Sequence, residues 1–145
     1  MSRLYFKASE RTDLLRIDMK AYERAAFRAN PALWDTLLAG TGALTLFQEE
    51  EIIAILTWRE VASGVCEISL LPSVRIDDCR VSAARIIRAA VRANTAKYRR
   101  VQATTLDSDL YRRSMRFLGM AEEGRMVKYM PDGSDLLIWG RVKWD

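Results

Sequence analysis

The part of the sequence that decides the fold reads SMRFLGMAEEGR, from Ser114 to Arg125. It contains the end of a predicted short helix over residues 107–118, and the apolar side chains of this helix lie on one of its faces. Gly119 stands where a residue in the left-handed conformation commonly ends a helix. Strands over 124–130 and 135–143 come next, joined by a Pro-Asp-Gly turn. These residues therefore predict a helix that leads into a C-terminal β-hairpin.

Outward from this stretch, strands and helices alternate along the chain. Alternating apolar and polar residues predict strands, and apolar residues at helical spacing predict helices. The expected strands span 3–8, 42–48, 51–60, 64–71 and 100–106. The expected helices run from Thr12-Asp13 to near Asn30, from Asn30-Pro31 to Gly40, and from a cap at Asp77 or Asp78 to about Ala96. The order predicts an α/β fold, in which a mixed central β-sheet of about seven strands is flanked by helices.

Two of these strands have a predicted orientation. A helix connects the strand over 64–71 to the strand over 100–106. A strand–helix–strand connection within one sheet is right-handed in nearly all proteins and links parallel strands. We therefore expect these two strands to be parallel neighbours.

Length and composition point to one folded domain over residues 1–145. Half of the residues are hydrophobic and 29% are charged, as in ordinary globular proteins. No apolar run approaches the roughly 20 residues of a membrane span. Lys7 lies where a signal peptide would need its apolar region. These features predict a cytoplasmic protein without a membrane partner.

The residue types present exclude several chemistries. The sequence contains no histidine, which removes Ser-His-Asp and Cys-His catalysis and any His-ligated metal site. Cys66 and Cys79 are the only cysteines, too few for a disulfide framework or a structural zinc. We therefore expect no metal site, and we expect Cys66 to be a small buried residue of a strand.

The element order and the residues from Ser114 to Arg125 are similar to those of the GNAT N-acyltransferase superfamily. Members end the corresponding helix in Leu-Gly-Phe and begin the next strand with Glu-Gly-Arg, and here Met120 replaces the Phe. Residues 128–133 and 135–140 resemble the final hairpin of the family. The resemblance implies a single GNAT-like domain, whose strands over 64–71 and 100–106 splay apart at one end to admit the pantetheine arm of acetyl-CoA.

The phosphate-binding loop of the family departs from its pattern here. Members carry Arg/Gln-x-x-Gly-x-Gly/Ala, and backbone N–H groups at a helix N-terminus wrap the pyrophosphate. In the matching stretch Arg75 fits, but Asp78 and Arg80 stand where the glycines belong. A carboxylate about 4 Å from a phosphate costs roughly 4 kcal/mol at an effective dielectric constant near 20. Arg80 could offset part of this cost by contacting the phosphate; in the alternative interpretation, Asp77 and Asp78 simply cap a structural helix.

The proton donor of the family is also missing. Many members use a Tyr four residues before the Gly of Leu-Gly-Phe to protonate the leaving thiolate, and that position is Met115, which cannot donate a proton. An Asn seven residues earlier often contacts the cofactor, and that position is Ser108. Tyr111 lies one turn before Met115 and is the candidate acid, the alternative being an ordinary packed or surface tyrosine.

A general base near the splayed strand would deprotonate the acceptor amine. Glu67 is the first candidate because it lies within the strand over 64–71, and Glu60 is the second. Exposed glutamates are common in strands, so a purely structural Glu67 is the alternative.

A stripe of three arginines and a terminal tryptophan are the candidate partner surfaces. Arg85, Arg88 and Arg92 share one side of a predicted helix. They fit the 3′-phosphate of CoA or an acidic surface, or they are a solvated face. Neighbouring aromatic residues do not interleave with them, which disfavours a stacking platform for single-stranded nucleic acid. Trp144 could dock onto a partner, whereas Trp139 is expected to be packed in its strand.

Three functions remain open. The first is a degenerate GNAT-like domain without a cofactor, a non-catalytic binding or assembly protein that contacts a protein partner or further copies of itself. It resembles phage-encoded GNAT-like proteins, including an internal virion assembly protein of short-tailed phages, which implies the host cytoplasm or the virion. The second is an active N-acetyltransferase with acetyl-CoA bound by Arg75, Arg80 and backbone amides, and with Glu67 and Tyr111 for proton transfer. The third, a nucleic-acid-binding module, is placed last.

Overall fold

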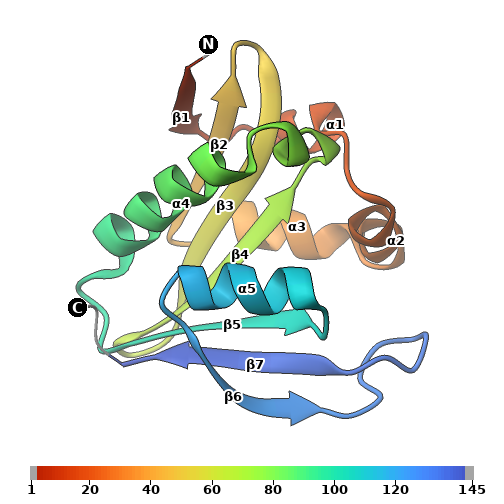
Figure 1. Cartoon of the computed structure of the whole chain (residues 1–145), viewed down its shortest axis with the longest axis vertical. Coiled ribbons are helices and arrows are strands. Elements are labelled where there is room, and N and C mark those ends of the chain that lie inside the picture. The colour runs from red at the N-terminus through yellow and green to blue at the C-terminus, as the bar shows by residue number, and fades with distance from the viewer. Residues whose placement is uncertain (1–2, 143–145) are drawn as a thin grey trace. The chain divides into compact units, whose positions relative to one another are not determined.

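Seven strands form one mixed sheet in the order β1-β2-β3-β4-β5-β7-β6, and helices flank it (Figure 1). The computed structural model describes residues 3–142. The strands are β1 (Leu4–Ala8), β2 (Gly42–Gln48), β3 (Glu51–Ala62), β4 (Val65–Pro72), β5 (Arg100–Leu106), β6 (Ala121–Met126) and β7 (Leu136–Arg141). The helices are α1 (Asp13–Arg16), α2 (Ala21–Ala29), α3 (Pro31–Leu38), the 3₁₀ helix η1 (Val74–Asp78), α4 (Arg80–Thr95) and α5 (Asp109–Phe117). The predicted α/β fold with a mixed seven-stranded sheet is confirmed.

The chain divides into two compact units. The first contains the residues up to Arg59 together with Ser69–Ile87, and the second contains Glu60–Ile68 together with the residues from Arg88 onward. The prediction of one domain over residues 1–145 stays a prediction. Among residues 3–142, no helix combines the length and the apolar character that crossing a membrane requires.

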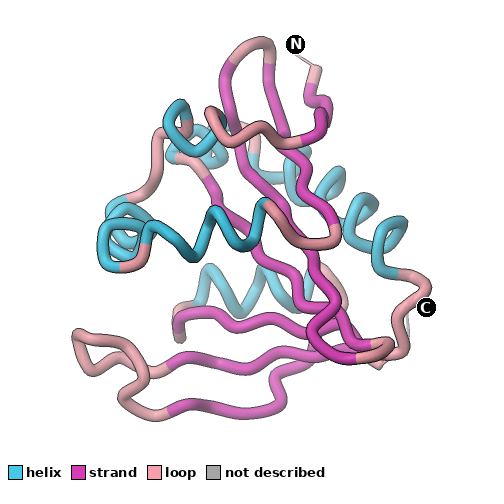
Figure 2. Tube along the Cα trace, turned by 180° about the vertical axis from the view of Figure 1, so that it is seen from behind, coloured by secondary structure: helices cyan, strands magenta, loops and turns pink. Residues whose placement is uncertain are grey.

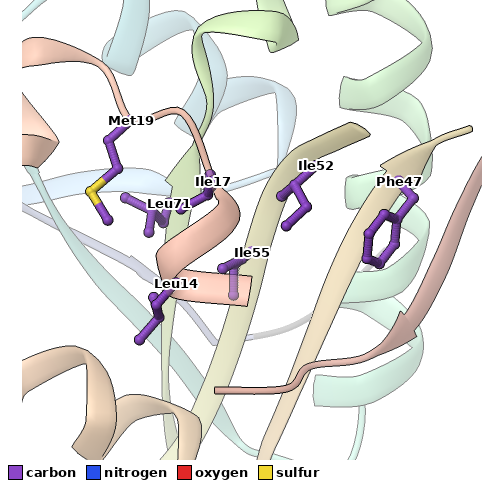
Figure 3. Close-up of a cluster of buried hydrophobic side chains, with 7 residues drawn as sticks. All are labelled: Leu14, Ile17, Met19, Phe47, Ile52, Ile55 and Leu71. Carbon is purple, nitrogen blue, oxygen red and sulfur yellow. The ribbon is translucent and has the colours of Figure 1, made fainter. Parts of the chain in front are cut away.

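The core of the first unit lies between its helices and strands β2 to β4. Its buried cluster consists of Leu14, Ile17, Met19, Phe47, Ile52, Ile55 and Leu71 (Figure 3). Side chains of a regular strand alternate between its faces, so Ile52 and Ile55 would normally point to opposite sides. The register between β2 and β3 shifts at Phe47, which pairs with Ile52, and this irregularity brings both isoleucines into one cluster.

The predicted continuous helix from residue 12 to near residue 30 is wrong. α1 ends at Arg16, Ile17 is extended with ψ 131°, and α2 begins only at Ala21. The interruption buries Ile17 and Met19. It also frees the carbonyl of Asp18, which accepts a hydrogen bond from the backbone N–H of Val74 at 2.9 Å. In an unbroken helix that carbonyl would bond within the helix.

Parallel pairing joins the two parts of β4 and β5 that belong to the second unit. The register contains three residue pairs, from Val65–Arg100 to Glu67–Gln102. The predicted parallel orientation is therefore confirmed. β4 then continues to Pro72 and β5 to Leu106, and these ends belong to different units, so the predicted splay stays a prediction.

The second unit has one sheet face against α5. Seen from behind the molecule, this helix lies beyond β5 (Figure 2). Met115 of α5 and Leu118, the residue after this helix, are buried, as is Cys66 of β4. Trp139 of β7 is 0% exposed, and its indole N–H donates to the Thr105 hydroxyl at 2.8 Å. The predictions of a packed Trp139 and a buried Cys66 are confirmed.

The turn after α5 has the geometry that the sequence predicts. Gly119 has φ +89°, in the left-handed region. Its N–H donates to the Arg116 carbonyl at 2.9 Å, and the Met120 N–H donates to the Met115 carbonyl at 2.9 Å. These two hydrogen bonds make a Schellman motif, which satisfies carbonyl groups at the helix end.

The predicted strands 124–130 and 135–143 are displaced from the observed hairpin. β6 begins at Ala121 and ends at Met126, and β7 covers Leu136–Arg141. Lys128 leaves the extended conformation with φ +54°, and its backbone N–H donates to the Asp135 carboxylate at 2.9 Å. The side-chain acceptor of Asp135 therefore replaces a strand partner and ends β6 early.

Candidate functional site

The segment that matches the family's phosphate loop forms η1 and the start of α4 in the first unit. Ser73 precedes it, and its hydroxyl accepts a hydrogen bond from the Arg75 N–H at 3.1 Å. The Arg75 guanidinium pairs with the Glu51 carboxylate at 3.0 Å. Within the described part of the chain, the carboxylates of Asp77 and Asp78 accept no hydrogen bond from a helix N–H. The interpretation of these aspartates as helix caps is therefore wrong, because Asp77 binds side chains instead.

Asp77 is the centre of a small charge cluster. Its Oδ1 accepts a hydrogen bond from Arg80 at 3.0 Å and another from Lys20 at 3.3 Å. The hydrogen bond from Arg80, the largest influence, holds the pKa of Asp77 below its ordinary value, and Lys20 acts in the same direction. Asp78 is exposed beside it. Burial, and secondarily the charge of Asp78, raise the pKa of the Cys79 thiol.

These contacts decide how well the loop fits a pyrophosphate. The N-terminus of α4 at Arg80 offers backbone N–H groups to an anion. The side-chain cations Arg75 and Arg80, however, already face carboxylates of the same unit. Each pair is partly exposed and contributes only about 0–1 kcal/mol, so a phosphate could displace one. Displacement would leave the carboxylates of Asp77 and Asp78 in the same segment, where their negative charge opposes the binding of an anion such as the pyrophosphate of a CoA thioester.

Glu67, the candidate base, lies on β4 in the second unit and is half-buried. Its Oε2 accepts a hydrogen bond from the Gln102 side chain at 3.4 Å. The second candidate, Glu60, accepts a hydrogen bond from the Gly64 N–H at 2.9 Å and so holds the β3–β4 turn. Glu67 is thus the better placed of the two for chemistry on the sheet surface.

A chain of polar side chains continues from Gln102 across the sheet, and the sequence analysis did not identify it. The Arg100 Nε donates to the Gln102 Oε1 at 3.1 Å, and the Arg100 guanidinium donates to both carboxylate oxygens of Glu123 at 3.0 and 2.5 Å. β7 lies between β5 and β6, so this ion pair passes over β7. It does so at Gly140, where a Cβ atom would lie 2.2 Å from the Glu123 carboxylate. The hydrogen bond from Arg100 lowers the pKa of Glu123.

The proposed cofactor contact Ser108 and candidate acid Tyr111 both lie at the start of α5. Ser108 is the N-cap, and its hydroxyl accepts a hydrogen bond from the Tyr111 N–H at 3.2 Å. Tyr111 is half-buried. Met115, at the position of the family's Tyr, is buried in the core. Ser108 therefore has a structural role, and any role in cofactor binding stays a prediction.

A second charge network, around Asp107, also went unidentified in the sequence. Arg112 donates to Asp107 at 2.6 Å, and Arg125 donates to Asp107 and to Asp135 at 2.8 Å each. The hydrogen bond from Arg112, followed by that from Arg125, lowers the pKa of Asp107. The sequence signal was the Arg of the Glu-Gly-Arg motif, which we assigned only to a strand start. The network ties the loop before α5 to β6 and to the final hairpin.

The arginine stripe lies on α4 as predicted, and it has an aromatic neighbour that the sequence did not indicate. The guanidinium of Arg88 lies 5.1 Å from the ring centre of Phe117 on α5, so an aromatic residue does accompany the stripe. Arg85 is exposed, whereas Arg88 and Arg92 are half-buried. Trp144 lies outside the described residues. Among residues 3–142, no group of three or more His, Cys, Asp or Glu side chains could hold a metal ion.

The structure gathers the predicted site residues into separate groups. Arg75, Asp78 and Arg80 share one segment of the first unit. Ser108 and Tyr111 share the first turn of α5 in the second unit, and Glu67 lies on β4 of that unit. Their catalytic and cofactor-binding roles stay predictions.

Comparison with known proteins supports the fold assignment. The sequence matches no protein-family model. No curated protein matches it significantly. Among solved structures, it is similar to a GNAT-family acetyltransferase from Bacillus anthracis, with a TM-score of 0.70, 14% identity and coverage of 98% of this chain and 96% of that one. It is also similar to a putative phosphinothricin N-acetyltransferase, with a TM-score of 0.73, 17% identity and coverage of 99% and 100%.

A third similar structure, an N-acetyltransferase from Staphylococcus aureus Mu50, has a TM-score of 0.72, 14% identity and coverage of 97% of this chain and 99% of that one. At such low identity these similarities establish the fold alone. The chain has the fold of the GNAT acetyltransferases over nearly its whole length.

Proposed function

We propose that this chain is a GNAT-fold protein with an altered acetyl-CoA site, and that it acts as a non-catalytic binding or assembly protein. The observation that carries the proposal is the position of the Asp77 carboxylate. It binds the side chains of Arg80 and Lys20 in the segment where the family binds pyrophosphate. A phosphate would have to replace a carboxylate that belongs to the chain itself.

The start of α5 supports the same proposal. Met115, at the position of the family's proton donor, is a buried apolar residue. Ser108 already accepts the Tyr111 N–H as a helix cap. Met115 cannot donate a proton, and the Ser108 hydroxyl is already engaged as a helix cap.

A role in a phage virion is the finer form of this proposal. It rests on the sequence resemblance to phage-encoded GNAT-like proteins. The structural neighbours are acetyltransferases and do not bear on it. In this form the chain would be found in the host cytoplasm or in the virion.

An active N-acetyltransferase is the second candidate, and one observation favours it. Glu67 is half-buried on β4 and accepts a hydrogen bond from Gln102, an arrangement that suits a positioned base. Tyr111 would then supply the proton to the leaving thiolate. The GNAT fold is compatible with this activity.

Calorimetric titration with acetyl-CoA separates the two candidates. We expect binding weaker than about 100 µM, because the carboxylates repel the pyrophosphate. Thiol release from acetyl-CoA, measured with a panel of primary amines and N-terminal peptides, should equal the rate without protein. Micromolar binding together with amine-dependent thiol release would overturn the proposal in favour of the enzyme.

A further inference from the structure

One surface of the second unit carries arginines that have no carboxylate partner among the described residues. Arg88 of α4 and Arg113 and Arg116 of α5 form no ion pair with any residue between 3 and 142. Phe117 and Leu110, on the same helix as the last two, are 38% and 37% exposed. We call these five residues the basic face.

The basic face is organised around Phe117. The Arg88 guanidinium lies 5.1 Å from the centre of its ring, which is a cation–π contact. Arg113 lies one helical turn before Phe117 and therefore beside it on the helix surface. The Arg88 Nε has no hydrogen-bond acceptor within the part of the chain that the structure describes. The face thus combines apolar area with guanidinium groups that lack anionic partners.

The first unit presents the opposite combination at the turn between β2 and β3 (Figure 1). Glu49 and Glu50 are exposed there, within the densest run of acidic residues in the chain. Arg16 donates to the Glu50 carbonyl at 3.1 Å, which holds the turn beside α1. The neighbouring Leu15 is 83% exposed. We call Glu49, Glu50 and Leu15 the acidic tip.

We propose that two copies of this chain associate through these surfaces, with the acidic tip of one copy on the basic face of the next. The inference rests on the proposed function, in which the chain acts through protein contacts. Glutamate carboxylates match the planar fork of the arginine guanidinium, and Leu15 supplies apolar area for Phe117 and Leu110. Because the two surfaces differ, the contact is head-to-tail and produces rings or filaments.

A second copy suits the basic face better than a nucleic acid does. Base stacking on an aromatic side chain needs an open ring face, and the guanidinium of Arg88 already lies against Phe117. Phosphate recognition would also leave the exposed Leu110 of the basic face without an apolar partner. A carboxylate-bearing apolar tip accounts for both the charge and the apolar area.

Sedimentation velocity of the full chain over a range of concentrations tests the proposal. We expect the weight-average mass to rise with concentration at about 0.05 M salt and the association constant to fall at least about tenfold at about 0.5 M, because salt screens the contacts. A monomer at every concentration in low salt would overturn the inference. It would leave the proposed function standing, since that is tested by acetyl-CoA titration.

Charge-reversal variants identify the surfaces. Arg113→Glu/Arg116→Glu removes the basic face, and Glu49→Lys/Glu50→Lys removes the acidic tip, so each variant alone should be monomeric. Mixing the two should restore association, because each retains the surface that the other lacks. Arg28→Glu is the control, since this arginine of α2 is exposed and distant in sequence from both surfaces. Circular dichroism verifies folding, and Glu50→Lys alone replaces the double tip variant if the latter unfolds.

Three results would overturn the inference. Association that survives both reversals would show that the contact lies elsewhere. A mixture of the two variants that stays monomeric would show that the two surfaces do not bind one another. The third is a monomeric chain that binds a labelled DNA duplex in a salt-sensitive manner and loses this binding in Arg113→Glu/Arg116→Glu. That result would assign the basic face to nucleic acid.

Discussion

Two segments differ in how closely they follow the sequence pattern of the GNAT family: Ser73–Arg80 and Ser108–Arg141. The second keeps the features that build the fold, including the Schellman turn at Gly119 and the packed Trp139. The first keeps a helix start but carries Asp78 and Arg80 at the glycine positions of the ligand loop. Residues that fill the core thus follow the family pattern in one segment, and the other segment departs from that pattern at positions that face the cofactor in the family. The two sets of residues do not overlap, so the fold does not depend on the positions that depart.

The largest effect is expected from breaking the retained segment. Trp139→Ala removes a fully buried ring and its hydrogen bond to Thr105, and the free energy of unfolding should fall by about 3–5 kcal/mol. Urea denaturation followed by circular dichroism measures the loss. Val127→Ala, at an exposed position of the same segment, is the control and should change stability little. Equal effects of the two variants would contradict the packing described for β7.

The next largest effect concerns the altered loop. Asp78→Gly removes an exposed carboxylate and restores a glycine of the family pattern, so affinity for acetyl-CoA should rise about tenfold, or about 1.4 kcal/mol. Titration calorimetry measures the change. Asp78→Asn separates the effect of charge from that of backbone freedom. If neither variant gains affinity, repulsion by Asp78 is not what limits binding.

The two roles considered for Ser108 predict different outcomes on substitution. Ser108→Ala removes the helix cap and should cost about 1 kcal/mol of stability. Ser108→Asn restores the family's residue and keeps a good N-cap, so its stability should match that of the unmodified chain. Thermal unfolding measures both variants. A stable Ser108→Ala protein would contradict the capping role.

Substitution of Gly140 is expected to change the stability of the fold only through its contact with the Glu123 side chain. Gly140→Ala places a methyl group on the Glu123 carboxylate, which can shift at the loss of its ion pair with Arg100. The pair is partly exposed, so the cost should be below about 1 kcal/mol. A double-mutant cycle by urea denaturation provides the test: in the Glu123→Ala background, Gly140→Ala should have no effect. A cost that persists there would mean that the methyl group meets the backbone instead.

The smallest effect is expected from the exposed Asp107 network, and it depends on pH. Hydrogen bonds from Arg112 and Arg125 lower the pKa of Asp107 in the folded chain. A lowered folded-state pKa stabilises the fold above the unfolded-state value of about 3.9, and this contribution is lost as pH falls through the folded-state pKa. Asp107→Asn should therefore reduce stability at neutral pH and match the unmodified chain in strong acid. Thermal unfolding from neutral pH to strong acid measures the difference in stability, with Asp78→Asn as control. An Asp107→Asn protein that is more stable than the unmodified chain at neutral pH would contradict the prediction.

Local sequence signals predicted most of the fold. The strands over 42–48 and 100–106 have the predicted bounds, because the alternation of apolar and polar residues also decides their pairing. The break between α1 and α2 was missed, since Leu14, Ile17 and Ala21 are spaced as on one face of a helix. The extended conformation of Ile17 and Met19 is fixed by tertiary contacts, including the hydrogen bond from Val74 to Asp18. Such contacts have no signal within the segment itself.

The sequence predicted the local structure around the candidate site better than the interactions of its residues. Arg80 begins a helix and Ser108 precedes one, close to the predicted helix starts, while their roles in cofactor binding stay predictions. The sequence could not indicate that Asp77 would bind Lys20, which lies far away in sequence. The chain from Glu67 through Gln102 and Arg100 to Glu123 joins three strands, so only the register of the sheet brings it together.

The ion pair that passes over Gly140 also limits how this sequence can change over time. Positions 100, 123 and 140 lie on three different strands, yet a side chain at 140 and the contact between 100 and 123 exclude one another. A lineage that gains a larger residue at 140 gives up the pair, after which selection on Arg100 and Glu123 relaxes. The three positions should therefore co-vary among related chains, with glycine at 140 accompanying opposite charges at 100 and 123.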